Sequence, residues 1–201
     1  MTIFTLPTIP GEFQWHIPPV EWNYEPTKGL FILAGAQTDW FIAPDGNYDK
    51  DNAPCALVTL TDNNFLLSAK VSVAFDSTFD AGVLQIRTTK DQWAKLCFEY
   101  SPQHHPMIVS VVTRGVSDDC NSVEIDGSEI FLRVVRTPQS LAFHFSHDGR
   151  NWQFVRYFTL GQLGSLQVGF SAQSPTGAKC AVTFSEMSYR QGTIKDNRSG
   201  E

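Results

Sequence analysis

The sequence predicts an all-β fold in which two antiparallel sheets pack face to face as a sandwich of the jelly-roll type. About a dozen runs of β-branched, aromatic and aliphatic residues recur along the chain, separated by glycine, proline, asparagine and aspartate turn signals. No window shows the spacing of apolar residues that is typical of an amphipathic helix. The length of 201 residues suits one well-cored domain, and we expect residues 1–201 to form it.

Residues 1–30 are rich in tryptophan and proline, and this composition excludes a regular helix. The prolines are Pro7, Pro10, Pro18, Pro19 and Pro26. We expect the segment to lie over the sandwich in extended form, anchored by Trp15 and Trp22. At the other end, residues 191–201 are polar, and we expect this tail to be frayed.

Between these ends we expect twelve strands, each a run of strand-forming residues bounded by turn signals. In chain order they are Leu30–Ala34, Asp39–Ala43, Cys55–Leu60, Phe65–Phe75, Ala81–Thr88, Gln92–Ser101, Pro106–Thr113, Glu129–Arg136, Leu141–Ser146, Gln153–Thr159, Ser165–Gln173 and Ala178–Tyr189. The order of these strands in the sheets does not follow from the sequence.

The run from Gln92 to Ser101 carries the clearest functional signal, because successive strand side chains point to opposite faces. One face fits the core, with Ala94, Leu96, Phe98 and Tyr100. The other face carries an aromatic ring, a cation and a carboxylate, in the series Trp93, Lys95, Cys97 and Glu99. Lys95 and Glu99 lie roughly 13 Å apart along an ideal strand, so each needs a partner from a neighbouring strand or from a ligand.

The same alternation assigns polar residues of other strands to a face opposite the core. If these strands share one sheet, their side chains line a polar concave surface. The residues concerned are Gln85, Arg87, Lys95, Glu99, Arg133, His144, Gln167 and Gln173.

The composition limits the kinds of binding partner and the cellular compartments that fit this protein. Fifteen basic and 21 acidic residues give a net charge of −6, which argues against binding to nucleic-acid backbones. We expect no secretory leader and no membrane anchor, because residues 1–10 lack basic residues and no apolar run reaches membrane-spanning length. The four cysteines, Cys55, Cys97, Cys120 and Cys180, lie far apart in the sequence. We therefore expect them to be free thiols in a reducing cytoplasm, and we expect no metal or cofactor.

Several segments, taken in order, resemble a known family. They are Thr38-Asp39-Trp40, Ala81–Leu84, Trp93-Ala94-Lys95 with Glu99-Tyr100, Ser110–Asp118, Leu132–Arg136, Ser146–Trp152 and Val168–Pro175. The family is one of unknown function that includes the fungal "regulation of enolase" protein. The resemblance covers roughly Thr38 to Tyr189 and implies the concanavalin A-like lectin/glucanase fold. For one branch of the family, the enolase connection implies a protein partner such as a glycolytic enzyme, although a fold alone does not supply a function.

Candidate contacts beyond the Lys95 strand fall in two places. Asp39 and Trp40 combine a hydroxyl acceptor with a ring that can stack on a sugar; the alternative for Trp40 is a plain core position. Arg114, Ser117 and Asp118 follow the strand ending at Thr113 in a glycine-containing exit loop, and loops on rigid sheets often carry binding groups. The alternative is an ordinary turn in which the Ser117 and Asp118 side chains bond the local backbone.

Two motifs resemble those of carbohydrate-active proteins but have structural alternatives. Glu124 to Glu129 has the spacing of the catalytic strand of retaining β-glucanases, whose carboxyls lie about 5–5.5 Å apart. The dipeptide Asp126-Gly127 within it instead favours a turn that would separate the two glutamates. Ser146–Trp152 resembles a sialidase Asp-box with one residue missing, and we interpret Asp148-Gly149 as a structural hairpin turn.

Two further candidate sites involve histidines. His104 and His105 lie between prolines, which predicts a loop, and no metal-ligand set is visible around them. His144 lies opposite an apolar strand face and is a candidate for proton transfer, with a hydrogen-bonded structural histidine as the alternative.

We therefore expect a cytoplasmic domain that binds a carbohydrate or sugar-derived small molecule on a polar concave face. The predicted contacts are Asp39, Trp40, Trp93, Lys95, Glu99, Arg114, Asp118, Arg133 and Gln173. Arginines among them would suit a ligand with an acid group. One alternative is an enzyme with Glu99 or His144 as general acid/base and Lys95 as an electrostatic helper. A second alternative is a regulatory protein that binds a partner and has no pocket chemistry.

Overall fold

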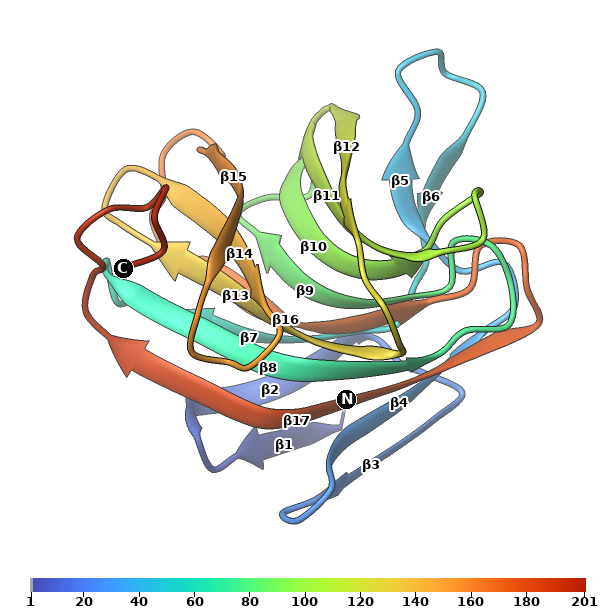
Figure 1. The fold of residues 1–201 in the computed structure, drawn as a ribbon, viewed down its shortest axis with the longest axis horizontal. Helices are drawn as coiled ribbons and strands as arrows, with labels where there is room; N and C mark the ends of the chain where they lie inside the picture. Colours follow the sequence, from blue (N-terminus) through green and yellow to red (C-terminus); the bar gives the residue numbers. More distant parts are fainter. Residues whose placement is uncertain (1) are drawn as a thin grey trace.

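The computed structural model describes residues 2–201 as two stacked antiparallel sheets with a separate hairpin at one end (Figure 1). The all-β two-sheet sandwich expected from the sequence is confirmed. Within residues 2–201 no helix has the length and apolar character needed to cross a membrane.

The eight-stranded sheet contains, in spatial order, β1 (Ile3–Leu6), β2 (Ile9–Ile17), β7 (Cys55–Leu60), β16 (Leu166–Gln173), β9 (Ala81–Arg87), β10 (Gln92–Tyr100), β11 (Pro106–Arg114) and β12 (Val116–Glu124). The seven-stranded sheet contains β15 (Gln153–Phe158), β14 (Leu141–Ser146), β13 (Glu129–Arg136), β8 (Phe65–Ala74), β17 (Lys179–Gln191), β4 (Gly29–Gly35) and β3 (Glu21–Glu25). The hairpin consists of β5 (Trp40–Ile42) and β6 (Asp49–Asp51).

All twelve expected strands are present, with ends shifted by at most two residues. Sequence reasoning missed β1, β2, β3, β6 and β12. The last of these corrects the predicted exit loop: Gly115 adopts a φ of +81°, and the chain then turns back to pair with β11. The region after Arg114 is therefore an edge strand of the eight-stranded sheet.

The N-terminal segment is extended, as expected, but it belongs to the sheets instead of lying over them. β2 pairs with β7, and β3 pairs with β4. The rings of Trp15 and Trp22 lie 5.5 Å apart, and Trp22 packs against the core cluster that includes Trp15. The two tryptophans thus join an edge of one sheet to an edge of the other.

The main core lies between the two sheets and confirms the face assignment made for β10. Ala94, Leu96 and Phe98 all point into this core. Phe170 of β16 and Phe184 of β17 meet across the interface with ring centroids 4.8 Å apart. Because full burial of one such side chain stabilises by roughly 1.5–3 kcal/mol, this face holds β10 firmly in place.

The opposite, outer face of the eight-stranded sheet is also covered in part. The segment 36–54, which includes the β5–β6 hairpin, folds over β10 and β11, so that Trp40 and Ala53 pack against Trp93 and Val111. The backbone N–H of Ile42 donates to Ser117 Oγ of β12 at 3.0 Å. This cover explains why both faces of β10 are buried along most of its length.

The C-terminal tail is packed, which contradicts the expectation that it is frayed. Arg133 Nη2 donates to the carbonyl oxygen of Gly200 at 2.8 Å, and His144 Nε2 lies 2.7 Å from the carbonyl oxygen of Asn197. Ile194 packs against a small cluster on β8, β13 and β14. Residues 192–201 therefore lie over the outer face of the seven-stranded sheet.

Gly169 tests the packing of β16 against β7. A Cβ atom at this position would lie 1.8 Å from the backbone oxygen of Ala56, which cannot move without disturbing the sheet. We expect Gly169→Ala to lower the free energy of unfolding by about 1–3 kcal/mol. At Gly164 a Cβ atom would meet open space, so Gly164→Ala should change the free energy of unfolding by less than about 0.5 kcal/mol. Denaturant titration of both variants measures this difference, and equal stability would contradict the packing described.

Candidate functional site

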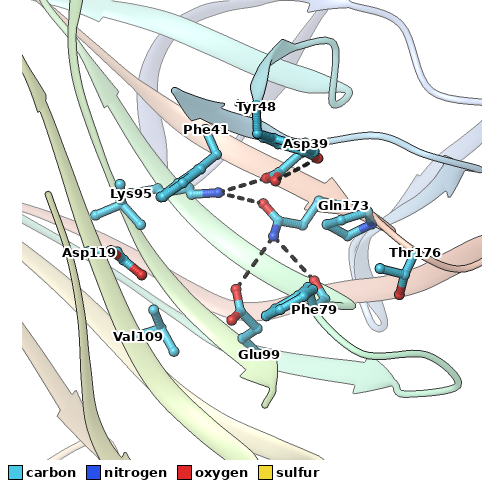
Figure 2. A pocket seen from close by; sticks show the side chains of 12 residues that line it. Asp39, Phe41, Tyr48, Phe79, Lys95, Glu99, Val109, Asp119, Gln173 and Thr176 are labelled. Atoms are coloured by element: carbon cyan, nitrogen blue, oxygen red, sulfur yellow. Dashed lines mark hydrogen bonds and ion pairs between the residues drawn. The ribbon is translucent and has the colours of Figure 1, made fainter. Parts of the chain in front are cut away.

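A cavity of about 290 Å³ lies on the outer face of the eight-stranded sheet, below the β5–β6 hairpin (Figure 2). Its floor and walls come from β10, β11, β12 and β16, from segment 36–54 and from two turns. The lining residues are Asp39, Phe41, Tyr48, Phe79, Lys95, Glu99, Val109, Val111, Asp119, Gln173, Pro175 and Thr176. The volume is at the small end of ligand pockets, which span about 300–1,000 Å³.

A connected set of polar side chains forms the floor. Lys95 Nζ donates to Asp39 Oδ1 and to Gln173 Oε1, each at 2.9 Å. The other end of the Gln173 amide donates to the carbonyl oxygen of Phe79 at 3.2 Å and, weakly, to Glu99 Oε2 at 3.5 Å. Gln173 therefore links the cation to the second carboxyl, as the dashed lines in Figure 2 show.

Strand register explains why the side chains of Gln173, Glu99 and Lys95 lie on the same face of the sheet. Gln173 of β16 lies opposite Ala81 of β9, which in turn lies opposite Glu99 of β10. Residues in one such row point to the same face and are separated by about 4.8 Å per strand. Glu99 and Lys95 share that face because they are four residues apart on β10.

Asp39 reaches the floor because its chain segment is clamped to the end of β16. Thr38 and Ser174 form an isolated bridge, in which Ser174 N donates to Thr38 Oγ1 at 3.0 Å. The Asp39 carboxylate also accepts from the backbone N–H of Trp40 at 2.7 Å and from Tyr48 Oη at 3.2 Å. Three donors, from Lys95, Trp40 and Tyr48, thus fix this carboxylate.

Burial acts in opposite ways on the two charged residues of β10. At Lys95, burial disfavours the cation, but the nearby acidic groups, Asp39 first among them, together outweigh it, so that the pKa of this amine is raised. At Glu99, burial raises the pKa of the carboxyl to about 8, against the attraction of Lys95 and with a further contribution from Asp39 and Asp119. Lys95 is therefore a fixed cation, whereas Glu99 titrates near neutral pH.

Four predicted contact residues line this cavity: Asp39, Lys95, Glu99 and Gln173. Their role in binding stays a prediction. The expected partners exist but do not come from the strands next to β10. Asp39 precedes β5 and Gln173 ends β16, two strands away; both serve Lys95, and Gln173 also reaches Glu99.

Trp40 and Trp93 do not line the cavity, which corrects their proposed stacking role. They are 3% and 1% exposed, and their rings pack edge to face with centroids 5.7 Å apart. Trp40 Nε1 donates to the carbonyl oxygen of Ala53 at 2.9 Å. The core alternative for Trp40 is thus the correct one.

Arg114 and Asp118 also lie away from the cavity. Arg114 donates to the carbonyl oxygen of Thr159, at 2.6 Å from its Nη2 atom. Asp118 pairs with Arg156 of β15 at 3.0 Å. Both contacts point toward the seven-stranded sheet, because Asp118 lies opposite Val112, a core residue of β11.

Arg133 and His144 belong to β13 and β14 of the seven-stranded sheet, so they cannot share a face with Lys95. The guanidinium of Arg133 lies 4.2 Å from the centre of the Trp152 ring, beneath the C-terminal tail. His144 is fully buried, and burial lowers its pKa to about 4. The structural-histidine alternative therefore holds, and the general acid/base hypothesis for His144 is wrong.

Sequence reasoning missed eight residues that line the cavity, among them Phe41, Tyr48, Phe79 and Asp119. Asp119 was within reach, since extending the alternation of β11 around the Gly115 turn places it, and not Asp118, on the outer face. Phe41 is the strand neighbour of Trp40 and points the other way for the same reason. No sequence pattern marks Phe79 or Tyr48.

The remaining motifs are structural. Glu124 ends β12 and Glu129 begins β13, so the two glutamates lie on strands of different sheets, as the turn prediction required. Asp148 accepts hydrogen bonds from the backbone of Arg150 and Asn151, which confirms the turn in the Asp-box-like segment. Among residues 2–201, no group of three or more His, Cys, Asp or Glu side chains is placed to hold a metal ion.

The fold is a β-sandwich similar to those of carbohydrate-binding modules and of proteins with glycoside hydrolase domains. The GH43 protein BlXynB from Bacillus licheniformis matches with a TM-score of 0.71 and 16% identity, over 90% of this chain and 37% of that one. The carbohydrate binding module CBM66 from Bacillus subtilis matches with a TM-score of 0.57 and 11% identity, over 89% of this chain and 95% of that one. At these identities the likeness shows the fold alone.

Within this class the chain belongs to the family described as "Protein of unknown function (DUF1349)", whose model matches residues 15–192. A functionally unknown protein from Saccharomyces cerevisiae has a TM-score of 0.81 and 24% identity, over 90% of this chain and 97% of that one. No curated protein matches the sequence. The expected membership of a family of unknown function is confirmed.

The buried ion pair predicts a large cost for removing its cation. Lys95→Met leaves the Asp39 carboxylate, 7% exposed, without its counter-charge, and we expect a loss of about 3–5 kcal/mol in the free energy of unfolding. The matched control is Lys70→Met, since Lys70 pairs with the exposed Glu129 at 2.7 Å and should contribute less than about 1 kcal/mol. Urea titration of both variants measures the difference. Similar losses would show that the Lys95 pair is not the structural centre described here.

The raised pKa of Glu99 predicts a pH-dependent stability. Because the folded-state pKa of about 8 exceeds the ordinary value of 4.5, the unfolded state binds fewer protons between these limits, and stability falls as pH rises through that window. Glu99→Gln removes this titration, so its stability relative to wild type should increase by about 3–4 kcal/mol from pH 5 to pH 8. Thermal unfolding across that range measures the trend, with the exposed Glu124→Gln as control. Parallel curves for wild type and Glu99→Gln would refute the shift.

Proposed function

We propose that the cavity binds a small hydroxylated molecule of the carbohydrate class, about the size of a monosaccharide. The supporting observation is the combination of a polar floor with aromatic walls in a space of about 290 Å³. A sugar presents hydroxyl groups that pair with fixed polar groups and C–H faces that pack on rings. Lys95, Gln173 and Glu99 supply the polar groups, and Phe41, Tyr48 and Phe79 supply the rings.

The backbone of Phe79 adds to this proposal. Phe79 has a φ of +70°, a left-handed conformation that is rare for a bulky residue and costs about 1–3 kcal/mol. Its N–H donates to the carbonyl oxygen of Tyr100 at 2.7 Å, and its carbonyl oxygen accepts from Gln173. Strain of this kind, held by surrounding hydrogen bonds, clusters at ligand sites.

The similar structures support the same class of ligand. One of them is a carbohydrate binding module, and another is an alginate lyase from Klebsiella pneumoniae that matches with a TM-score of 0.57 and 13% identity. This support is an analogy of fold, so the proposal depends on the cavity itself. The acid group anticipated for the ligand is dropped, because Arg114 and Arg133 contact other parts of the fold.

A second candidate function is acid/base catalysis on such a ligand. Glu99 favours it, because a buried carboxyl with a pKa of about 8 that faces a cavity can hold and release a proton near neutral pH. The binding function and the catalytic function can be distinguished by comparing wild type with the Glu99→Gln variant. If the protein is an enzyme, Glu99→Gln binds the ligand without converting it; if it is a binding domain, wild type and variant both leave the ligand intact.

The third alternative is a protein-partner role like the one implied by the resemblance to the regulator of enolase. It predicts that no small carbohydrate stabilises the protein. The cytoplasm stays the proposed location on the basis of four free cysteines, three of them buried.

The first test is a thermal-shift screen of the purified protein against neutral sugars, sugar acids and sugar phosphates. A ligand at about one hundred times its dissociation constant stabilises by roughly 2.7 kcal/mol, which is readily measured. We expect stabilisation by sugars without an acid group. If these three sets and a fourth set of amino sugars all leave the melting temperature unchanged, the carbohydrate proposal is wrong.

The second test removes the ring at the strained position. Phe79→Gly relieves the backbone and deletes the aromatic wall, so binding should weaken at least about tenfold while stability stays within about 1–2 kcal/mol of wild type. His104→Gly is the matched control, since His104 has a φ of +65° in an exposed loop outside the cavity. Calorimetric titration with the best sugar of the screen should show normal affinity for that control. Equal affinity in Phe79→Gly would remove this ring from the binding site.

A further inference from the structure

The charges around the cavity are unbalanced. Among the described residues, Lys95 is the one cation of the lining, and Asp39 already neutralises it at 2.9 Å. Two further carboxyls, Glu99 of β10 and Asp119 of β12, face the same space from either side of Val109 on β11, as Figure 2 shows. The wall opposite Gln173 is therefore acidic.

Glu99 has unused hydrogen-bonding capacity that points into this space. The residue is 8% exposed, and its Oε2 atom receives only the 3.5 Å contact from Gln173. Within residues 2–201, its Oε1 atom accepts no hydrogen bond from another side chain or from the backbone. Since Glu99 lines the cavity, a donor supplied by a ligand can reach this acceptor and form a hydrogen bond with it.

Asp119 makes a positively charged donor preferable to a neutral one. Its carboxylate is exposed at the rim, yet close enough to Glu99 for the two to repel, since it contributes to the raised pKa of Glu99 after burial and Asp39. A cation between them would favour the ionised form of Glu99, relieve the repulsion and form charge-assisted hydrogen bonds with both carboxylates.

The aromatic walls favour the same kind of group. Phe41 and Tyr48 extend from the hairpin with ring centroids 6.3 Å apart, and Phe79 lies beside Glu99. Ring faces attract an ammonium group electrostatically, and cavities that combine rings with carboxylates are used to recognise such cations.

We propose that the ligand carries a protonated amine in addition to its hydroxyl groups, as an amino sugar does, and that Glu99 and Asp119 accept its N–H groups. The inference rests on the proposed function and specifies the ligand class of the same cavity. It excludes sugar acids and sugar phosphates, whose negative charge would face the Asp119 carboxylate and oppose the ionisation of Glu99.

Calorimetric titration at pH 7 with four related sugars tests this inference. Glucosamine and glucose differ by one amine, N-acetylglucosamine masks that amine, and glucuronate carries the opposite charge. We expect glucosamine to bind at least about tenfold more tightly than glucose or N-acetylglucosamine, and glucuronate to bind least. Asp119→Asn should reduce this preference, and the double variant Glu99→Gln/Asp119→Asn should abolish it.

Asp118→Asn is the matched control, because Asp118 is the chain neighbour of Asp119 but pairs with Arg156 outside the cavity. It should retain the full preference. Equal or tighter binding of glucose would overturn the amine inference and leave the carbohydrate proposal standing. Failure of all four sugars to bind would overturn both, and a preference that survives in the double variant would overturn the assignment to Glu99 and Asp119.

Discussion

The buried ion pair between Lys95 and Asp39 is the constraint on which the site depends. Burying one charge alone is costly, so a lysine that is 2% exposed requires a carboxylate within contact distance. That carboxylate comes from a segment far away in the sequence, and holding it there brings segment 36–54 down onto the outer face of β10 and β11. The hairpin that roofs the cavity is thus a consequence of neutralising Lys95.

Neutralising Lys95 also determines what is left for a ligand. Gln173 has one amide, and its oxygen is committed to Lys95 while its nitrogen is shared between Phe79 and Glu99. Glu99 is therefore the member of the network with the weakest partner, and its pKa of about 8 reflects that position. One end of the floor is a rigid structural pair, and the other end responds to whatever enters the cavity.

Much of the site was predictable from the alternation of side chains between the two faces of each strand. Alternation along single strands correctly placed Lys95 and Glu99 on one face, and it placed Gln173 on the corresponding face of β16. Alternation does not reveal sheet membership, which is why Arg133 and His144 were grouped with residues of the other sheet. Errors of one residue had a larger effect. Trp40 and Asp118 were predicted as contacts, but their chain neighbours Phe41 and Asp119 line the cavity, because adjacent strand residues point to opposite faces.

The alternation of side chains along the strands also limits how much of the function can be inferred from the shared fold. A sandwich of this type fixes which strand positions face outward, and that part is common to proteins at 11–24% identity. The roof depends on contacts outside the two sheets, because the rings of Phe41 and Tyr48 come from a hairpin. That hairpin is attached through Asp39, the Thr38–Ser174 bridge and the contact between Ile42 and Ser117. Sheet residues therefore supply the charges of the site, while the hairpin supplies its aromatic shape. Selectivity for a ligand in this chain depends on how those two parts meet, and a comparison of folds alone does not determine it.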